Sequence, residues 1–215
     1  MVEQGRLDLA SVEAVLLDMD GTLVDSDGTI ERAWAAWARE HELDVETVLA
    51  VAHGHPAIRT IRNLLPGLGE EAVTAAARRQ EDLEYDDAAD VTATAGAHDL
   101  LAALDRAGLA WAVVTTADDR LAEQRLKAAG IEPPVLVTLD DVRAAKPDPE
   151  GYLRAATLLG VAPSACLVVE DSAPGLAAGR SAGMRTAALR GLDGDLRLPD
   201  LGRLAHLLER SRVRP

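Results

Sequence analysis

The sequence predicts an α/β protein, in which a doubly wound parallel sheet forms the core and an all-helical segment is inserted into it. Two observations carry this prediction. From about Ala95 onward, apolar runs typical of strands alternate with helical patterns, as repeated βα units on a parallel sheet require. Between Gly28 and Thr92, in contrast, the pattern is helical throughout, so this segment is expected to stand outside the sheet.

The core elements follow one another with short connections. The expected strands are Ala14–Leu17, Ala110–Thr115, Val135–Val137, Cys166–Glu170 and Arg185–Leu189. The expected helices between them are Ala97–Ala107, Asp119–Ala129, Glu150–Leu159 and Pro174–Ala182. Each of these helices ends close to a glycine, the residue that most often terminates helices. The tail from Leu196 to Arg210 is expected to form a short extended piece and a closing helix.

The inserted segment predicts four helices of its own. They are expected at Glu31–His41, Asp44–Ala52, Pro56–Leu65 and Glu70–Tyr85. Trp34 and Trp37 have the spacing of a packed helical stripe, so we expect them in the interior of this segment. The predicted division is a core domain of residues 1–27 and 93–215, and a helical domain of residues 28–92. A helical domain inserted just after the first strand could close over that strand's loop.

Composition and charge narrow the possible partners. The chain has 215 residues, with 48% hydrophobic and 27% charged residues, and no apolar run near the ~20 residues that cross a bilayer. A net charge of −14 argues against a nucleic-acid partner. Cys166 is the single cysteine, so no intrachain disulfide can form, and we expect a buried thiol. We expect the protein to be cytoplasmic and to have no membrane partner. We also expect it to be a monomer or a weak dimer.

A pair of carboxylates closes the first predicted strand. Asp18 and Asp20 directly follow the apolar run Ala14–Leu17, and Gly21 allows the chain to turn sharply after them. Side chains two residues apart at the end of a strand project to the same side. Because open α/β sheets bind ligands at the carboxyl ends of their strands, this pair is a candidate catalytic site. One carboxylate could attack as a nucleophile while the other moves a proton.

Three further polar segments stand at the predicted carboxyl ends of strands or next to them. They are Thr115 with Thr116, Lys146, and Glu170 with Asp171. Separately, they could be ordinary strand residues, a solvated surface charge and a helix N-cap. Together with the aspartate pair, they bring hard oxygen donors, a hydroxyl and a cation to one crevice. Oxygen donors of this kind suit Mg²⁺, and the lysine and hydroxyl would offset the charge of a phosphoryl group in transfer.

The order of these motifs resembles that of the haloacid dehalogenase (HAD) superfamily, over nearly the whole chain. The resemblance implies a Rossmann-like core and a nucleophilic Asp18 that becomes a phosphoaspartate. It implies that Asp20 protonates the leaving oxygen, later deprotonates water and offers its backbone carbonyl to Mg²⁺. Thr115 and Lys146 would hold the phosphoryl group. The implied metal site comprises Asp18, Asp20, Glu170 and Asp171.

The helical segment resembles the small cap of this superfamily, which lies between the first two motifs. Its Glu31–Trp34 segment and its His53-Gly54 step resemble the branch that hydrolyses small sugar and polyol phosphates. The expected substrate contacts are His53, Gly54, His55, Arg59 and Thr60 near the cap, and Thr115, Thr116 and Lys146 in the core. The resemblance therefore implies a Mg²⁺-dependent phosphatase, a phosphoric monoester hydrolase, for small sugar or polyol phosphate monoesters.

Other functions remain open alternatives. One is a phosphotransferase like β-phosphoglucomutase, but Ile30 stands where that enzyme has a cap-linker histidine, which favours water as the acceptor. A second is a phosphatase of the phosphoglycolate type. A third is a non-catalytic phospho-switch or binding protein, which would be expected to lack a catalytic residue or to order its motifs differently. Turnover of a generic aryl phosphate with Mg²⁺ would separate an enzyme from a binding protein.

Overall fold

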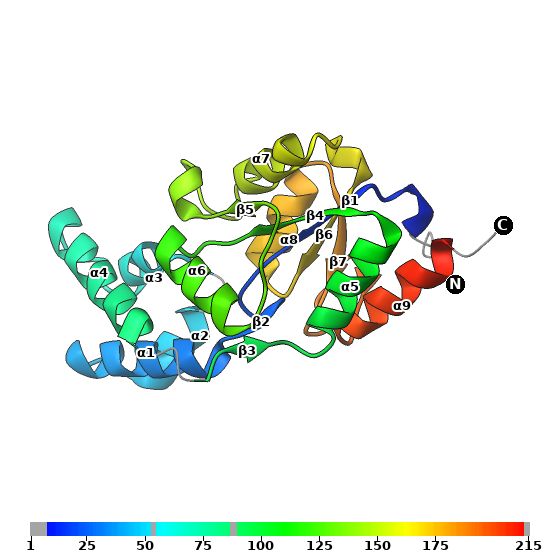
Figure 1. Cartoon of the computed structure of the whole chain (residues 1–215). Coiled ribbons are helices and arrows are strands. Elements are labelled where there is room, and N and C mark those ends of the chain that lie inside the picture. Colours follow the sequence, from blue (N-terminus) through cyan, green and yellow to red (C-terminus); the bar gives the residue numbers. More distant parts are fainter. Residues whose placement is uncertain (1–7, 53–54, 87–89, 213–215) are drawn as a thin grey trace, which may run out of the picture.

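A six-stranded parallel sheet lies at the centre of the computed structural model, which describes residues 8–52, 55–86 and 90–212. In sheet order the strands are β5 (Leu136–Val137), β4 (Ala110–Val114), β1 (Ala14–Leu17), β6 (Cys166–Glu170), β7 (Arg185–Ala188) and β8 (Leu196–Arg197). All neighbouring strands run parallel, so their carboxyl ends meet at one edge (Figure 1). The predicted α/β fold class is confirmed.

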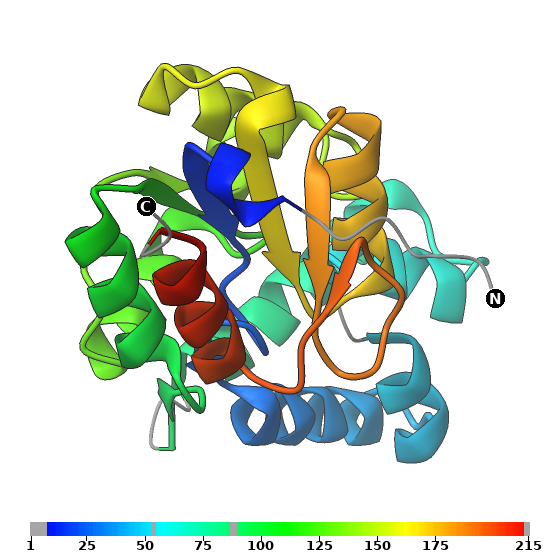
Figure 2. The same cartoon turned by 90° about the vertical axis from the view of Figure 1, so that its right-hand side faces the viewer.

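Helices cover both faces of this sheet, as a doubly wound fold requires. They are α5 (Ala97–Ala107), α6 (Asp119–Ala128), α7 (Glu150–Leu159), α8 (Ala173–Ser181) and α9 (Leu201–Arg212), and the short 3₁₀ turns are η1 (Leu9–Ser11), η2 (Leu139–Asp141) and η3 (Pro163–Ala165). In β1, Val15 and Leu17 pack into the cluster that includes residues of α5, α6 and α9, whereas Ala14 and Leu16 pack with α7 and α8. Figure 2 shows α5 and α9 side by side on one face. Because successive strand residues point to opposite faces, the continuous apolar run fills both cores.

Four helices form a separate group at the end of the molecule opposite η1 and α9 (Figure 1). They are α1 (Asp27–Glu40), α2 (Val45–Ala52), α3 (Ala57–Leu64) and α4 (Glu70–Asp86). Their own core contains Trp34 and Trp37, whose rings meet edge to face at 5.4 Å. Trp37 also donates its indole N–H to the carbonyl oxygen of Ala76 at 2.9 Å. No helix in the described parts of the chain has the length and apolarity needed to cross a membrane.

A small antiparallel ribbon, which the sequence did not predict, connects the helical group to the sheet. It pairs β2 (Val24–Asp25), before the group, with β3 (Thr92–Ala93), after it. Thr94 reinforces the ribbon by donating its hydroxyl to the carbonyl oxygen of Thr22 at 2.5 Å. Strands of two residues carry no recognisable periodicity, which is why the pattern of apolar residues could not show them. We retain the division into core and cap domains as a proposal, with this ribbon as the junction.

Candidate active site

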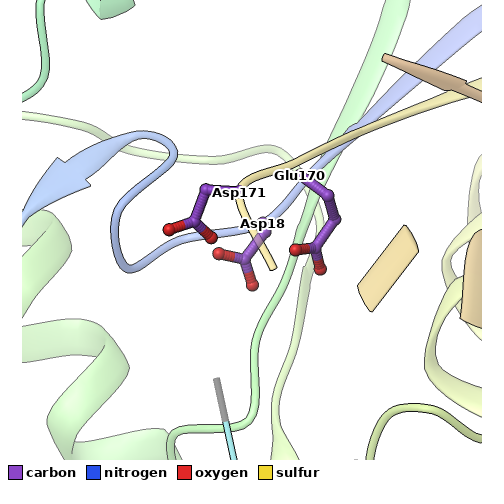
Figure 3. Close-up of side chains that lie close together, drawn as sticks. All are labelled: Asp18, Glu170 and Asp171. Carbon is purple, nitrogen blue, oxygen red and sulfur yellow. The ribbon is translucent and has the colours of Figure 1, made fainter. Parts of the chain in front are cut away.

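Three buried carboxylates gather at the carboxyl ends of the neighbouring strands β1 and β6. Asp18 follows β1, Glu170 ends β6, and Asp171 comes directly after it. Each offers an oxygen atom within 4.8 Å of the oxygens of the other two, and Figure 3 shows the three side chains converging. The parallel pairing of Leu17 with Val169 brings the two chain segments together, as the sequence predicted for strand ends.

The crowding of these carboxylates shifts their pKa values upward. Burial, reinforced by the charge of Glu170, raises the pKa of Asp18 well above its ordinary value, although Lys146 opposes the shift. The pKa of Asp171 is raised to about 7, first by burial and then by Glu170, with Arg190 opposing. A bound divalent cation would favour the ionised form of both groups. Perturbed carboxyl groups in a cleft are also typical of functional sites.

Lys146 lies inside this cluster rather than in solvent. Its ammonium donates hydrogen bonds to Asp18 Oδ1 at 2.5 Å, Glu170 Oε1 at 2.6 Å and the carbonyl oxygen of Val114 at 2.9 Å. Burial alone would lower its pKa, but the charges of Asp18 and Glu170 outweigh burial and raise it. Lys146 is therefore a fixed positive charge beside the carboxylate that the sequence predicts as the nucleophile.

Protein donors hold both oxygens of Glu170 in place. Oε1 accepts from Lys146 and from the hydroxyl of Tyr152, at 2.7 Å, while Oε2 accepts from the backbone N–H and the hydroxyl of Ser172. Helix α8 approaches the carboxylate so closely that a Cβ at Gly175 would lie 1.7 Å from Oε1. Glu170 thus fixes Lys146 in addition to facing the cluster.

Asp171 is held between the first loop and the end of β7. Arg190, after β7, lies 2.8 Å from Asp171 Oδ2 and 2.7 Å from Asp27 of α1. Asp171 Oδ2 is buried, and its contact with Arg190 is an ion pair rather than a hydrogen bond. Gly21 has φ +78°, and a Cβ there would lie 2.1 Å from this same oxygen. Only glycine allows the loop both this backbone conformation and this approach.

Asp20 is oriented by two groups outside the carboxylate cluster. Ser26, just before α1, donates its hydroxyl to Asp20 Oδ1 at 2.6 Å. Arg125, from α6, lies 2.9 Å from Asp20 Oδ2. Arg125 also donates to Glu84 of α4 at 2.5 Å, so this guanidinium joins the sheet domain to the helical group.

A cavity between the strand ends and the helical group brings most of the predicted site residues together. Its lining includes Asp18, Asp20, Thr115, Thr116, Lys146, Asp171 and, from the helical group, Ile30, Trp34, His55, Gln80, Glu81 and Glu84. Trp34 thus borders the cavity while packing in the helical core, where we had expected packing alone. The predicted contacts His53 and Gly54 lie outside the described residues.

Two predicted cap contacts do not line this cavity. The side chain of Arg59 is exposed on α3, and Thr60 is buried in the helical group with its hydroxyl unpartnered. Their contact with substrate stays a prediction that this cavity does not support. His55, which directly follows His53-Gly54, does line it, and burial and Arg59 lower the pKa of its ring.

Comparison with known proteins identifies the family. The model of the haloacid dehalogenase-like hydrolase family matches residues 12–183. The chain belongs to this family. Among curated HAD-like relatives, hexitol phosphatase A of Escherichia coli strain K12 is 42% identical over 199 residues, covering 92% of each chain. The N-acetylmuramic acid 6-phosphate phosphatase of Pseudomonas aeruginosa is 35% identical over 198 residues, covering 83% of this chain and 82% of its own.

A solved structure agrees with the fold. A hydrolase from Pseudomonas syringae superposes with a TM-score of 0.82 at 26% identity, over 92% of this chain and 98% of that one. The predicted enzyme class, a HAD-like phosphatase, is confirmed by the curated relatives. The acidic cluster is compatible with the divalent metal of such hydrolases, because three buried carboxylates offer oxygens within 4.8 Å of one another.

Several residues of this HAD-like site were missed from the sequence. They are Ser26, Arg125, Tyr152, Ser172 and Arg190. A signal did exist for Arg125: α6 buries Leu121, Ala122 and Leu126, and position 125 falls on the same helical face. A charged residue on a buried face requires a partner, and this one has two carboxylates.

Proposed function

We propose that this HAD-like phosphatase hydrolyses small sugar or polyol phosphate monoesters, with Mg²⁺ and through a phosphoaspartate on Asp18. The observation that carries the proposal is the convergence of Asp18, Lys146 and Asp171 at one cavity that Asp20 also lines, with the buried Glu170 bonded to Lys146. Asp18, Asp20, Glu170 and Asp171 would hold Mg²⁺, which when bound would neutralise phosphoryl charge and align the group for in-line attack.

In the first step, a carboxylate oxygen of Asp18 forms a bond to phosphorus while the bond from phosphorus to the ester oxygen breaks. Asp20 donates its proton to that departing oxygen, which leaves as an alcohol. Lys146 and Thr115 face the same cavity and would hold the phosphoryl oxygens. Lys146 also keeps Asp18 oriented through their 2.5 Å hydrogen bond.

In the second step, water attacks the phosphorus of the phosphoaspartate. Asp20, now ionised, takes a proton from that water, so the residue returns to its starting state. The bond from Asp18 to phosphorus breaks, and inorganic phosphate leaves. The net change is one ester and one water converted to one alcohol and one phosphate.

The chemistry of the cap side of the cavity supports a hydroxylated leaving group. His55 and Glu81 offer hydrogen-bonding groups there, beside the apolar Ile30, whereas Gln80 bonds to Glu84 and Glu84 to Arg125. The pKa of Glu81 is raised by burial and by Asp118 and Glu84, as expected in a site that excludes part of the solvent. Hexitol phosphatase A and N-acetylmuramic acid 6-phosphate phosphatase carry names that point to phosphorylated polyols and sugars.

A substrate panel tests this proposal. We would measure inorganic phosphate release with Mg²⁺ from hexitol phosphates, hexose phosphates, glycerol phosphate, nucleoside monophosphates and a phosphonate, compared as kcat/KM. We expect kcat/KM for the hexitol or hexose phosphates to exceed kcat/KM for nucleotides by at least ~10-fold. This ratio corresponds to a difference of about 1.4 kcal/mol in transition-state binding. Preference for nucleotides would contradict the substrate class. Product analysis for phosphate transferred to another hydroxyl would identify a phosphotransferase instead.

A further inference from the structure

Arg125 is a buried charge that belongs to the core yet contacts the cap. It lies in the last turn of α6, and only 3% of its side chain is exposed. One end of its guanidinium, Nη1, lies 2.9 Å from Asp20 Oδ2, and the other, Nη2, donates to Glu84 Oε2 at 2.5 Å. Two carboxylates from different parts of the chain therefore share a single buried cation.

The contact fixes the direction of the Asp20 carboxyl group. Ser26 donates to Oδ1, and Arg125 contacts Oδ2, so each oxygen has its own partner from a different element. A rotation of the carboxyl group about its terminal bond would break both contacts. Since proton transfer requires a donor within hydrogen-bond reach of the leaving oxygen, a fixed carboxyl direction is a catalytic requirement.

The cap supplies the other half of this arrangement. Glu84, near the end of α4, accepts from Gln80 Nε2 at 2.6 Å as well as from Arg125. Gln80 and Glu84 occupy the buried face of α4 together with Val73, Ala76 and Ala77. A buried cation that loses one of two carboxylate partners is strongly destabilised, so Arg125 has one stable position only while α4 lies against α6.

We propose that Arg125 is a positioning residue for Asp20, and that Glu84 makes this positioning depend on the cap being in place. The proposal rests on the proposed function, in which Asp20 protonates the leaving oxygen. With α4 against α6, Gln80 donates to Glu84, Glu84 holds the guanidinium, and the guanidinium holds Asp20. Moving the cap away would remove Glu84 and leave Asp20 with Ser26 as its remaining oriented partner.

The decisive measurement compares two leaving groups. Alkyl phosphates such as hexitol phosphates need a proton on the leaving oxygen, whereas nitrophenolate departs without one. We expect Arg125→Gln to lower kcat/KM for the alkyl ester by ~10²-fold, the effect of misplacing a catalytic group by about 1 Å. For 4-nitrophenyl phosphate we expect kcat/KM to decrease by less than ~5-fold, because kcat/KM does not include hydrolysis of the phosphoaspartate, in which Asp20 serves both esters alike. Arg125→Lys should recover part of the alkyl activity, because it restores the charge.

A double variant separates positioning from general support of the fold. If Arg125 acts through Asp20, adding Arg125→Gln to Asp20→Asn should change alkyl turnover by no more than ~2-fold, within the error of additivity. Arg79→Gln is the control, because Arg79 lies on α4, the helix that carries Glu84, and pairs with a carboxylate, Glu40, within the cap. This control should leave both substrates unaffected, because Arg79 lies outside the cavity lining.

Two results would overturn the positioning role. One is an equal loss for both esters in Arg125→Gln; the other is a full, additive loss in the Asp20→Asn background. If Arg125→Gln fails to fold, the nearly isosteric Glu84→Gln replaces it, with the same selective loss for the alkyl ester expected at ~5-fold. An equal effect of Glu84→Gln on both esters would overturn the link to the cap. Absence of Mg²⁺-dependent turnover in the unaltered protein would instead refute the proposed function itself.

Discussion

Replacing Asp18 with asparagine tests its role as the nucleophile without changing the shape of the side chain. Its carboxylate lies 2.5 Å from Lys146 and within the acidic cluster, so an amide of the same shape keeps the volume and removes one crowded charge. We predict that Asp18→Asn lowers phosphate release by at least ~10³-fold, as removal of a reacting group does. The melting temperature should stay close to that of the unaltered protein. Substantial activity in a preparation free of contaminating phosphatases would show that another residue is the nucleophile.

The absence of a side chain at Gly21 leaves room for the Asp171 carboxylate of the proposed metal site. A methyl group there would collide with Asp171 Oδ2, at 2.1 Å, and with Arg190. We predict that Gly21→Ala raises the Mg²⁺ concentration needed for half-maximal activity by ~10-fold or more, as loss of one ligand's alignment implies. Gly160→Ala is the matched control, since Gly160 also has a positive φ, +70°, but nothing within 4 Å of a new Cβ. Equal metal requirements in both variants would exclude a special role for Gly21.

The sequence predicts the contacts of some site residues but not of others. Asp18, Asp20, Lys146 and Asp171 could be predicted to meet, because the carboxyl ends of parallel strands share one edge. Arg125 could not be paired with Glu84, because the two residues are 41 positions apart and the packing of α4 on α6 depends on the entire tertiary fold. Local patterns predict which face a side chain occupies but not which distant face it meets.

Among the elements, we expect the helices of the cap to recognise the leaving group of the phosphate ester. His55 lines the cavity, whereas Arg59, one turn into α3, is exposed. We predict that His55→Ala raises KM for hexitol phosphates by ~10-fold, the loss of about one hydrogen bond, while 4-nitrophenyl phosphate is barely affected.

Arg62→Ala provides the control for this prediction, because Arg62 lies on the exposed side of α3 and pairs with Glu70. Arg59→Ala, measured beside them, tests the substrate contact predicted from the sequence. An equal change in KM for both esters in His55→Ala would argue against recognition of the leaving group by this segment.

Most elements of the sheet domain were predictable, including the short strands β5 and β8, whereas the ribbon of β2 and β3 was not. The predicted bounds of β1, α5 and α7 agree with the structure, because glycines and buried runs delimit them clearly. Predicted strand ends at Thr115 and Leu189 differ from the observed ends by one residue, where polar loop residues take over. The ribbon of β2 and β3 is held by long-range pairing of two residues with two, and no local pattern encodes it.

For the whole molecule, we expect metal binding to increase the stability of the folded state. The cluster of Asp18, Glu170 and Asp171 brings negative charges together in the interior, and a bound cation would relieve their repulsion. We predict that Mg²⁺ at 100 times its Kd adds ~2.7 kcal/mol to the free energy of unfolding and raises the melting temperature by roughly 5–10 °C. EDTA should abolish both this increase and the turnover.

Calcium is the control for the metal prediction. Because Ca²⁺ prefers longer bonds and more ligands than Mg²⁺, it should raise the melting temperature without supporting turnover. Asp171→Ala should greatly reduce stabilisation by either ion. Full phosphatase activity in EDTA, or an identical response of the Asp171→Ala variant to Mg²⁺, would contradict metal binding at this cluster.

The ribbon at the cap junction also makes the molecule modular. Because Val24 pairs with Ala93 and Asp25 with Thr92, the two points where the insertion leaves and re-enters the sheet domain are adjacent in space. A different polypeptide, or a two-residue hairpin turn such as Asn-Gly, could bridge the same gap without disturbing a strand of the main sheet. The sheet domain, with its catalytic residues, could therefore be combined with a different cap, either by natural exchange of segments or in engineered chimeras. Diversification of specificity would then proceed at one pair of splice points, while the chemistry beneath stayed unchanged.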